Sequence, residues 1–326
     1  MLFRSINKLG KIVPRAFPVA LQLDDQPEIP EDQSGRLQLA HWLTNRKHPL
    51  TSRVIVNRIW HHMFGTGIVA TVDNFGSTGK QPSHPELLDT LAVQFMQNGW
   101  SIKQLVREIA LSRTYRQSSA FQNASFQRDP DNRFLGRISK RRLEAECIRD
   151  GMLAASGELD LVRPVGSLVG RVIGDKPISL IGLDKRLPPD LDGCLSRSVY
   201  LPVIRDRLPD ILDLFDFAEP SLVTGNRETT NVPIQALYLL NSPFAQDRAN
   251  GLARRLIKDA GTDEQRILRA FLICFCRQPE QMEMNRSLDF LKNKKHSEDE
   301  SSDSVPTELI HFCQALLCTA EFRNLD

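Results

Sequence analysis

The chain has 326 residues, of which 41% are hydrophobic and 25% charged, so it can bury a substantial core as one large domain or two smaller ones. Its formal net charge of +2 argues against nucleic-acid binding, which needs a strongly basic surface. No stretch approaches the length of apolar sequence that crosses a membrane, so we expect no membrane span.

Arginine dominates the basic residues, with 30 arginines among the 42. Because a guanidinium pairs with a carboxylate through parallel hydrogen bonds, this bias predicts internal ion pairs or recognition of carboxylate, sulfate or phosphate, and we favour internal pairs. The six cysteines form neither a Cys-x-x-Cys pair nor a haem-attachment motif, so we expect no cofactor in this chain. The disulfide state of Cys274, Cys276, Cys313 and Cys318 is left open.

Residues 1–33 are rich in proline and acidic residues and are expected to form an extended lead-in. The N-terminal residues lack the sustained apolar segment of a secretory signal, so none is expected. Helical periodicity then predicts a short helix over 34–45 and a longer one over 49–65, with Gly65 in the left-handed turn that ends it.

The helix over 49–65 is the first candidate for a recognition surface. Its apolar residues fill one broad arc, while Arg53, Asn57 and His61 follow one another at spacings of four on the opposite edge. Arg58 and His62 form a second row beside them. The helix therefore offers guanidinium, amide and imidazole groups on one side and packs with the other.

A polar, glycine-bearing loop over 66–82 follows, and its length is typical of functional loops. Ser83 and Glu86 form the pattern of a capping box ahead of a helix that reaches about residue 98. Ser101 opens the next helix, which is expected to end near residue 112.

From Asp129 onward the sequence predicts another helical section, which includes a helix over 140–156. Arg142 and Glu146 lie along one row of that helix, a spacing typical of a solvated or interface ladder of ion pairs. Residues 158–196 lose the helical period and are expected to form a long irregular excursion.

The C-terminal part begins with Ser198–Val203, which reads as the one clear strand. A short helix is predicted over 208–217, followed by a polar loop, 224–231, whose side chains can cap a helix that includes Gln235. Further helices are expected over 243–258, 263–276, 279–294 and 306–320.

The expected fold class is mainly α, an irregular multi-helix domain with long loops and at most a small β element. We expect an N-terminal helical subdomain over 34–157, the excursion over 158–196, and a C-terminal helical subdomain over 197–326 that packs on the first.

Metal binding is the chemistry that the histidines suggest, but the sequence favours no metal site. The adjacent His61 and His62 point about 100° apart on a helix, so they rarely ligate one ion. His84 or Asp73 would have to supply further ligands, and His84 sits in the first turn of its own helix.

Three carboxylates, Asp213, Asp216 and Glu219, could supply an acid and a base for hydrolysis of a glycoside or an ester. Ion pairs with nearby arginines are the interpretation we prefer. Neither Gly-x-Ser-x-Gly, nor Gly-x-Gly-x-x-Gly, nor a P-loop pattern occurs, so the sequence assigns no catalytic residue. The arginines nearby are Arg197, Arg205, Arg207 and Arg227.

Polar loops on a helical scaffold commonly carry function, so the loops over 73–83 and 224–231 join the recognition helix as candidates. The predicted binding residues are Arg53, Asn57, Arg58, His61, His62, Asp73, His84, Arg142, Glu146, Arg227, Thr230 and Gln235.

Several long runs together resemble one known family. The sequence from about residue 35 to the C-terminus is similar to the planctomycete-enriched domain of unknown function fifteen fifty-three, the C-terminal module of large exported proteins. The runs that carry the likeness are NRIWHHMFGTGIVATVDNFGSTGKQPSHPELLDTLAVQF, GWSIKQLVREIALSRTYRQSS, DPDNRFLGRISKRRLEAECIRDGMLAASGELD, LFDFAEPSLVTGNRETTNVPIQALYLLNSPF and CQALLCTAEFRNLD.

The resemblance implies which domains accompany the chain, but it implies no reaction. Members of this family typically follow a second domain of unknown function and often a cytochrome-c-like domain, and carbohydrate-recognition modules also occur beside them. This chain carries no haem motif. The resemblance therefore implies an N-terminal partner domain, sometimes haem-bearing, in an exported protein.

Two hypotheses follow for function. The first is a non-catalytic binding or assembly module that docks onto a partner domain through arginine-rich helix faces. The alternative is a hydrolase or oxidoreductase domain acting on exported, anionic polysaccharide, for which His61, Arg58 and Asp216 would have to converge on one pocket.

Overall fold

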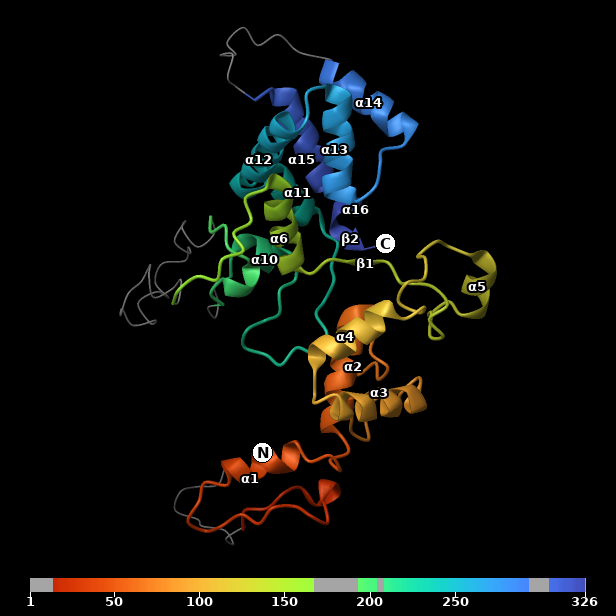
Figure 1. The fold of residues 1–326 in the computed structure, drawn as a ribbon, viewed down its shortest axis with the longest axis vertical. Helices are drawn as coiled ribbons and strands as arrows, with labels where there is room; N and C mark the ends of the chain where they lie inside the picture. Colours follow the sequence, from red (N-terminus) through yellow and green to blue (C-terminus); the bar gives the residue numbers. More distant parts are fainter. Residues whose placement is uncertain (1–13, 167–192, 204–207, 293–304, 326) are drawn as a thin grey trace. The chain divides into compact units, whose positions relative to one another are not determined.

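The computed structural model describes residues 14–166, 193–203, 208–292 and 305–325. Within these ranges the chain is mainly helical, and the strands form a single two-stranded antiparallel sheet (Figure 1). The mainly α class expected from the sequence is confirmed. In the described part of the chain, no helix is both long and apolar enough to cross a membrane.

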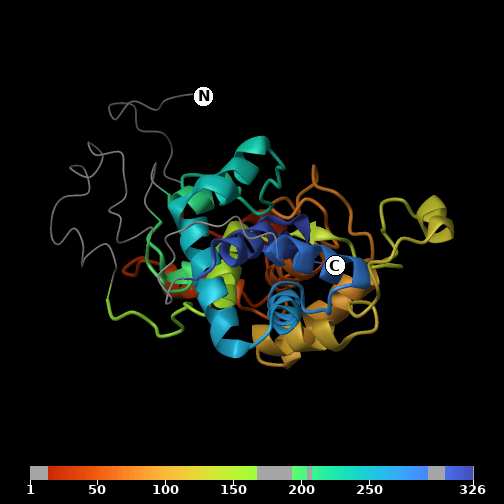
Figure 2. The same ribbon diagram turned by 90° about the horizontal axis from the view of Figure 1, so that it is seen from above.

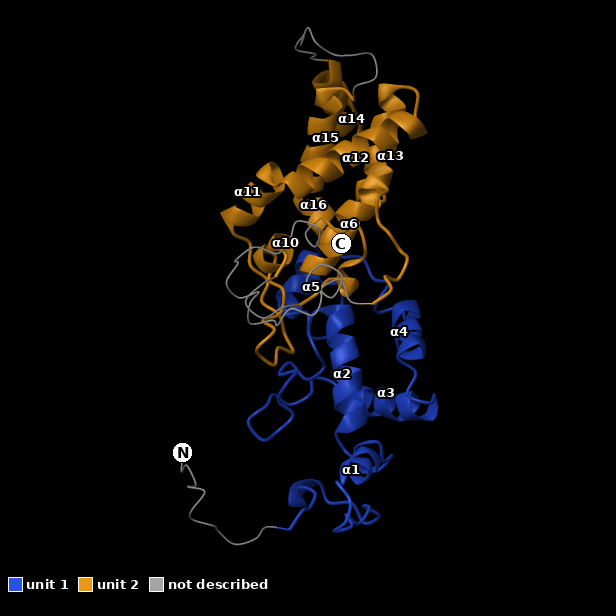
Figure 3. Cartoon of the chain, turned by 90° about the vertical axis from the view of Figure 1, so that its left-hand side faces the viewer, with its two compact units in different colours: residues 1–139 blue, residues 140–326 orange. Residues whose placement is uncertain are grey.

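The chain divides into two compact units, residues 1–139 and residues 140–326 (Figure 3). Each unit has its own hydrophobic core, and the two cores share no residue. The sequence placed the helix that it predicted over 140–156 in an N-terminal subdomain ending at residue 157. In the structure that helix belongs to unit 2, because Ile148 and Met152 on its inner side are fully buried in the core of that unit.

Unit 1 is built on one helix pair with a third helix against it. Helix α2 packs on α3, and apolar residues of α4 complete the core. Gly65 adopts φ 82° and donates its N–H to the carbonyl of His61 at 2.7 Å, so the left-handed end of α2 forms as predicted. The elements of unit 1 are η1 (Val19–Leu21), α1 (Arg36–Leu43), α2 (Thr51–Phe64), α3 (Pro85–Gln97), α4 (Ile102–Leu111) and α5 (Asn123–Arg128).

Two local predictions in unit 1 are wrong. Ser83 does not cap α3, because its hydroxyl donates to the carbonyl of Ile68 at 3.2 Å and the helix begins one residue later than a cap at Ser83 requires. No helix starts at Asp129, because its carboxylate accepts the main-chain N–H groups of Arg133 and Phe134 at 2.9 and 2.8 Å. Asp129 folds the chain into a tight loop there.

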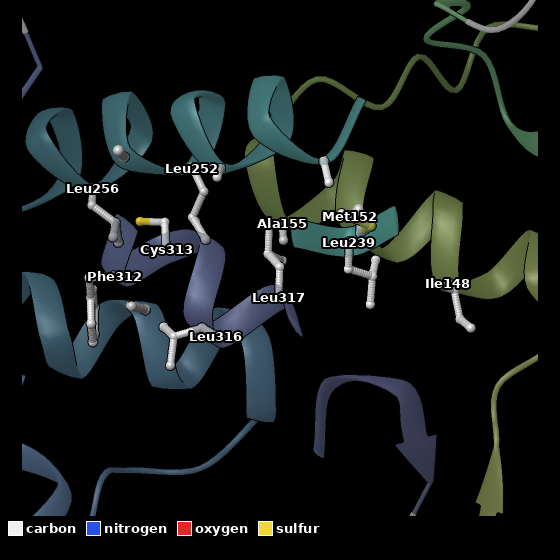
Figure 4. Packing of buried hydrophobic residues seen from close by; sticks show 14 of the residues in the cluster. Ile148, Met152, Ala155, Leu239, Leu252, Leu256, Phe312, Cys313, Leu316 and Leu317 are labelled. Carbon is white, nitrogen blue, oxygen red and sulfur yellow. The ribbon is translucent and has the colours of Figure 1, made fainter. Parts of the chain in front are cut away.

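Unit 2 is a helical bundle. Helices α12 and α15 pack side by side, and α6, α11 and α13 also contact α12 (Figures 1 and 2). Figure 4 shows Leu252 and Leu256 of α12 pointing toward α15, where Cys313 faces them, while Phe312 and Leu316 lie on the other side of α15. The elements of unit 2 are β1 (Arg141–Arg142), α6 (Ala145–Ser156), η2 (Ser198–Tyr200), α10 (Asp210–Leu214), α11 (Pro233–Asn241), α12 (Pro243–Asp259), α13 (Asp263–Phe275), α14 (Gln281–Lys292), α15 (Thr307–Cys318), α16 (Ala320–Arg323) and β2 (Asn324–Leu325).

Unit 2 corrects two further expectations. The predicted helix over 140–156 begins only at Ala145, because β1 pairs antiparallel with β2 at the C-terminal end of the chain. The predicted strand at Ser198 is a turn of 3-10 helix, because the carboxylate of Asp150 accepts both the N–H and the O–H of Ser198, at 2.8 and 2.7 Å. Much of the excursion expected over 158–196 lies outside the described residues.

Candidate functional site

The predicted recognition edge of α2 is engaged inside unit 1. Arg53 pairs with Asp89 of α3 through Nε at 2.6 Å and donates Nη1 to the carbonyl of Pro49. Arg58 pairs with Asp73 of the following loop at 3.5 Å. Both arginines therefore connect α2 to neighbouring segments, in line with the internal pairing that the arginine bias suggested.

Asn57 closes the loop that follows α2. Its side chain is fully buried, its Nδ2 donates to the carbonyl of Val69 at 3.0 Å, and its Oδ1 accepts the N–H of Val69 at 2.8 Å. Gly67 passes close to the same amide, since a Cβ on it would lie 2.9 Å from both amide atoms of Asn57. Asn57 thus acts as a structural clasp and does not face solvent.

The histidines do not assemble into one centre. His61 is buried and His62 exposed, with their ring centroids 5.5 Å apart. His84 contacts the hydroxyl of Ser83 through Nδ1 at 3.0 Å and lies edge-on to Phe134. No group of three His, Cys, Asp or Glu side chains that could hold a metal ion occurs among the described residues.

A pocket of about 690 Å³ lies within unit 1, between the C-terminal end of α2, the loop that leads into α3, and the loop over 131–139. Of the residues chosen from the sequence, His84 lines it. Arg58, His61 and Asp73 do not. The lining residues are Trp60, Phe64, Thr66, Gly67, Ile68, Ala70, Lys80, Gln81, Ser83, His84, Asp131, Asn132, Arg133, Leu135 and Ser139.

The loop over 131–139 contributes pocket-lining residues that the sequence analysis did not select as candidates. Asn132 is buried at φ 51°, and its Nδ2 donates to the carbonyl of Arg137 at 2.8 Å and to the hydroxyl of Ser139 at 3.1 Å. The amide of Gln117 donates to the carbonyl of Leu135 at 2.8 Å. These bonds fix the loop, and with it the position of Arg133 on the pocket wall.

In unit 2, two of the other predicted residues, Arg142 and Thr230, meet at the carboxylate of Asp216. This carboxylate accepts the N–H and the hydroxyl of Thr230, each at 2.9 Å, and an N–H of Arg142 at 2.6 Å. Asp216 itself adopts φ 62°, a conformation uncommon for an aspartate. Burial opposes ionisation of this group, but the bonds from Thr230 and Arg142 outweigh burial and lower the pKa of Asp216.

Arg142 and Gln235 extend this network to the main chain. Arg142 donates to the carbonyl of Phe215 at 3.1 Å and also to the carbonyl of Thr230. Gln235 donates Nε2 to the carbonyl of Leu214 at 2.9 Å and to the hydroxyl of Thr230 at 3.1 Å. The network therefore fastens the two ends of the loop between α10 and α11 to β1 and to each other.

Arg227 anchors the middle of that same loop on α6. Its two terminal nitrogens pair with the two oxygens of Glu146 at 2.7 and 3.0 Å, and Glu144 lies 3.3 Å away. The guanidinium also lies over the ring of Phe217, 4.9 Å from its centroid. Burial disfavours the charged form of Arg227, yet the hydrogen bonds that it donates to Glu146 outweigh burial and raise the pKa of Arg227.

This cluster has the chemistry of an ionic lock. An acid or base in catalysis needs a pKa near the working pH and a lone pair or proton within reach of substrate. Asp216 has a lowered pKa and already accepts three donors. His61 and Arg58 belong to unit 1 and Asp216 to unit 2, so the convergence of this trio stays a prediction.

Comparison with known proteins identifies a family. No curated protein and no solved structure shows significant similarity to the chain. One family model, described as a protein of unknown function (DUF1553, also called PSD1), matches residues 35–291, which is more than half of the chain. The closing run CQALLCTAEFRNLD lies beyond the matched residues. The chain belongs to the DUF1553 family of proteins of unknown function.

Proposed function

We propose that the chain is a non-catalytic binding module that assembles with a partner domain. The observation that carries the proposal is the Asp216 network. In it, the carboxylate of Asp216, the guanidinium of Arg142 and the amide of Gln235 hold the loop between α10 and α11 in place. A carboxylate held ionised by an arginine and a threonine stabilises a scaffold and has no free role in proton transfer.

The surface proposed for docking is the outer side of α11. Ile234, Leu237 and Leu240 are 55%, 56% and 51% exposed and recur every three residues, whereas Gln235 and Leu239 on the inner side are buried. Exposed apolar groups that share one helix face commonly mark a protein interface. The arginines of the network are already paired, so we place docking on this apolar face and not on a charged one.

The partner proposed is the N-terminal domain that typically precedes members of this family, with a cytochrome-c-like, haem-bearing domain as the next candidate. Either would have to present an apolar groove that accepts one face of the nine-residue helix α11. Such an interface needs about 1,000 Å² of total buried surface to be stable.

The test is sedimentation velocity of the full chain mixed with a separately expressed N-terminal family domain. We expect a 1:1 complex with the wild-type chain and its loss in the Leu237→Glu variant. Leu268→Glu, at a partly exposed position of α13, is the control and should bind like the wild type. Absence of a wild-type complex, or equal binding by Leu237→Glu, would contradict the proposal.

A catalytic role on exported anionic polysaccharide is the second candidate, and the pocket of unit 1 favours it. Its volume of about 690 Å³ lies within the range of small-molecule sites. The measurement is release of reducing ends from a polyuronide by the full chain, compared with His84→Ala and Asp131→Ala variants, because these two residues line the pocket. Turnover that both substitutions abolish would support this role, and lack of turnover by the wild type would exclude it for that substrate.

A further inference from the structure

We propose that the pocket of unit 1 binds a small organic anion that also carries hydroxyl groups, with its carboxylate or sulfate held by Lys80 and Arg133. The proposal does not rest on the docking function assigned to unit 2, because every residue that it uses belongs to unit 1. It concerns binding and requires no reaction.

The side chains of Lys80 and Arg133 make no hydrogen bond and no ion pair with any residue in the described part of the chain. The carboxylate of Asp129 attracts the charge of Arg133, but it accepts only the main-chain N–H of that residue. By contrast, Arg53 and Arg58 pair with aspartates, and Arg137 donates to the carbonyls of Asp129 and Pro130. Two cations on one pocket wall thus keep their full hydrogen-bonding capacity for a ligand.

The main chain holds both cations in place. The N–H of Lys80 donates to the hydroxyl of Thr71 at 2.9 Å, and that hydroxyl donates to the carbonyl of Asn74. The N–H of Arg133 donates to the carboxylate of Asp129 at 2.9 Å, beside the buried Asn132. A ligand would therefore order two side chains and no backbone, which lowers the entropic cost of binding.

The remaining lining indicates what else the ligand carries. Asp131 is the one carboxylate at the pocket, so the described lining has an excess of positive charge over negative. Gln81, Ser139 and His84 add amide, hydroxyl and imidazole groups that can pair with ligand hydroxyls. The volume of about 690 Å³ exceeds the needs of an inorganic ion and suits an organic acid of sugar size.

The binding test is isothermal titration calorimetry of the full chain at low ionic strength with three probes: D-galacturonate, neutral D-galactose and inorganic sulfate. We expect galacturonate to bind at least about tenfold more tightly than galactose, because a charge-assisted pair adds one to a few kcal/mol. Sulfate should compete with galacturonate, and added salt should weaken binding. Equal affinity for galactose, or no binding of galacturonate, would overturn the proposal.

Point variants test whether the anion binds at this pocket wall, because some should weaken galacturonate binding and another should strengthen it. Lys80→Gln and Arg133→Gln should each weaken galacturonate binding by about tenfold. Asp131→Asn should strengthen it, because one repelling charge is removed from the wall. Lys103→Gln on α4, an exposed cation that does not line the pocket, should bind as the wild type does.

The Asp131→Asn variant also separates this proposal from a cation site, for which the same change would weaken binding. Thermal unfolding of each variant shows whether it is folded. We expect Lys80→Gln and Arg133→Gln to be folded, because both residues are exposed. Unchanged affinity in both Lys80→Gln and Arg133→Gln would place the anion elsewhere and refute the assignment. Docking of the partner domain on α11 would be unaffected in either case.

Discussion

At the scale of single residues, the structure shows how a carboxylate that looks catalytic in the sequence becomes structural. The side chain of Asp216 is 16% exposed, and its partners Thr230 and Arg142 lie 14 and 74 positions from it in the sequence. Its positive φ is tolerated because those bonds fix the main chain around it. The residue stabilises the loop between α10 and α11 most when it is ionised.

Acid unfolding should report this role. The folded-state pKa of Asp216 lies below its unfolded value of 3.8, so its contribution to stability is complete above that value and is lost as the pH falls through the folded pKa. We expect Asp216→Asn to lose about 1–3 kcal/mol of unfolding free energy at pH 7. The difference from the wild type should shrink below about pH 4.

Urea denaturation of the wild type and the variant from pH 7 to pH 3 is the measurement. Asp213→Asn is the matched control, because Asp213 is exposed on α10 and forms no ion pair or side-chain hydrogen bond with the described residues. The unfolding free energy of Asp213→Asn should equal that of the wild type from pH 7 to pH 3. A difference between Asp216→Asn and the wild type that stays constant across this range would show that the charge does not matter.

Arg149 shows a second structural use of a guanidinium. It is fully buried, donates to the carbonyls of Ser196 and Cys194, and lies 5.5 Å from the ring of Phe244. Burial lowers the pKa of Arg149, but an arginine stays charged at neutral pH. Its bonds satisfy carbonyls that would otherwise be unpaired, and so hold the segment before η2 against α6.

At the scale of elements, the loop after α2 is shaped by close backbone contacts. A Cβ on Gly67 would lie 2.5 Å from the carbonyl oxygen of Val69, closer than such atoms approach in proteins. The same loop contains Gly76, where a Cβ would meet only the side-chain oxygen of Asn74, at 3.2 Å. The loop therefore requires glycine at position 67, whereas a small side chain at position 76 would need only a small shift of the Asn74 side chain.

We expect Gly67→Ala to destabilise the chain by about 1–3 kcal/mol, because the added methyl group must push the Asn57 clasp apart. Gly76→Ala should change the unfolding free energy by no more than about 0.5 kcal/mol. Chemical denaturation measures both. Equal effects of the two substitutions would mean that the Asn57 clasp does not constrain this loop.

At the scale of the whole molecule, two separate cores imply two folding units. The core of unit 2 draws on residues from Ala145 to Leu317, and none of them comes from unit 1. Helix α15 supplies five of its buried side chains, although it lies beyond the end of the family match at residue 291. Folding of unit 2 therefore depends on residues that the family model does not include.

A chain of residues 140–326 should fold alone and unfold in one cooperative transition, because its core is complete. A chain of residues 140–304 should not, because removal of α15 exposes the inner face of α12, including Leu252 and Leu256. Circular dichroism during thermal unfolding distinguishes the two. Failure of the longer chain to fold would show that unit 2 needs unit 1.

The sequence was sufficient for much of the local structure. The mainly α class, the left-handed end of α2 at Gly65, and the Ser101 cap, whose hydroxyl accepts the N–H of Gln104, all follow from spacing and residue type. Internal pairing of arginines was also predictable for Arg53, Arg58 and Arg227. These features depend on neighbours in the chain, or on the general preference of a guanidinium for a carboxylate.

Only the tertiary structure decided which side chains meet. Arg142 and Asp216 are separated by 74 positions in the sequence, and the loop carrying Arg133 reaches the pocket wall because Asp129 and Asn132 fold it there. Ser83 fits a capping pattern, yet its hydroxyl is taken by a carbonyl from another segment. Local periodicity fixes the face of a helix that a residue occupies, but the path of the chain determines what that face contacts.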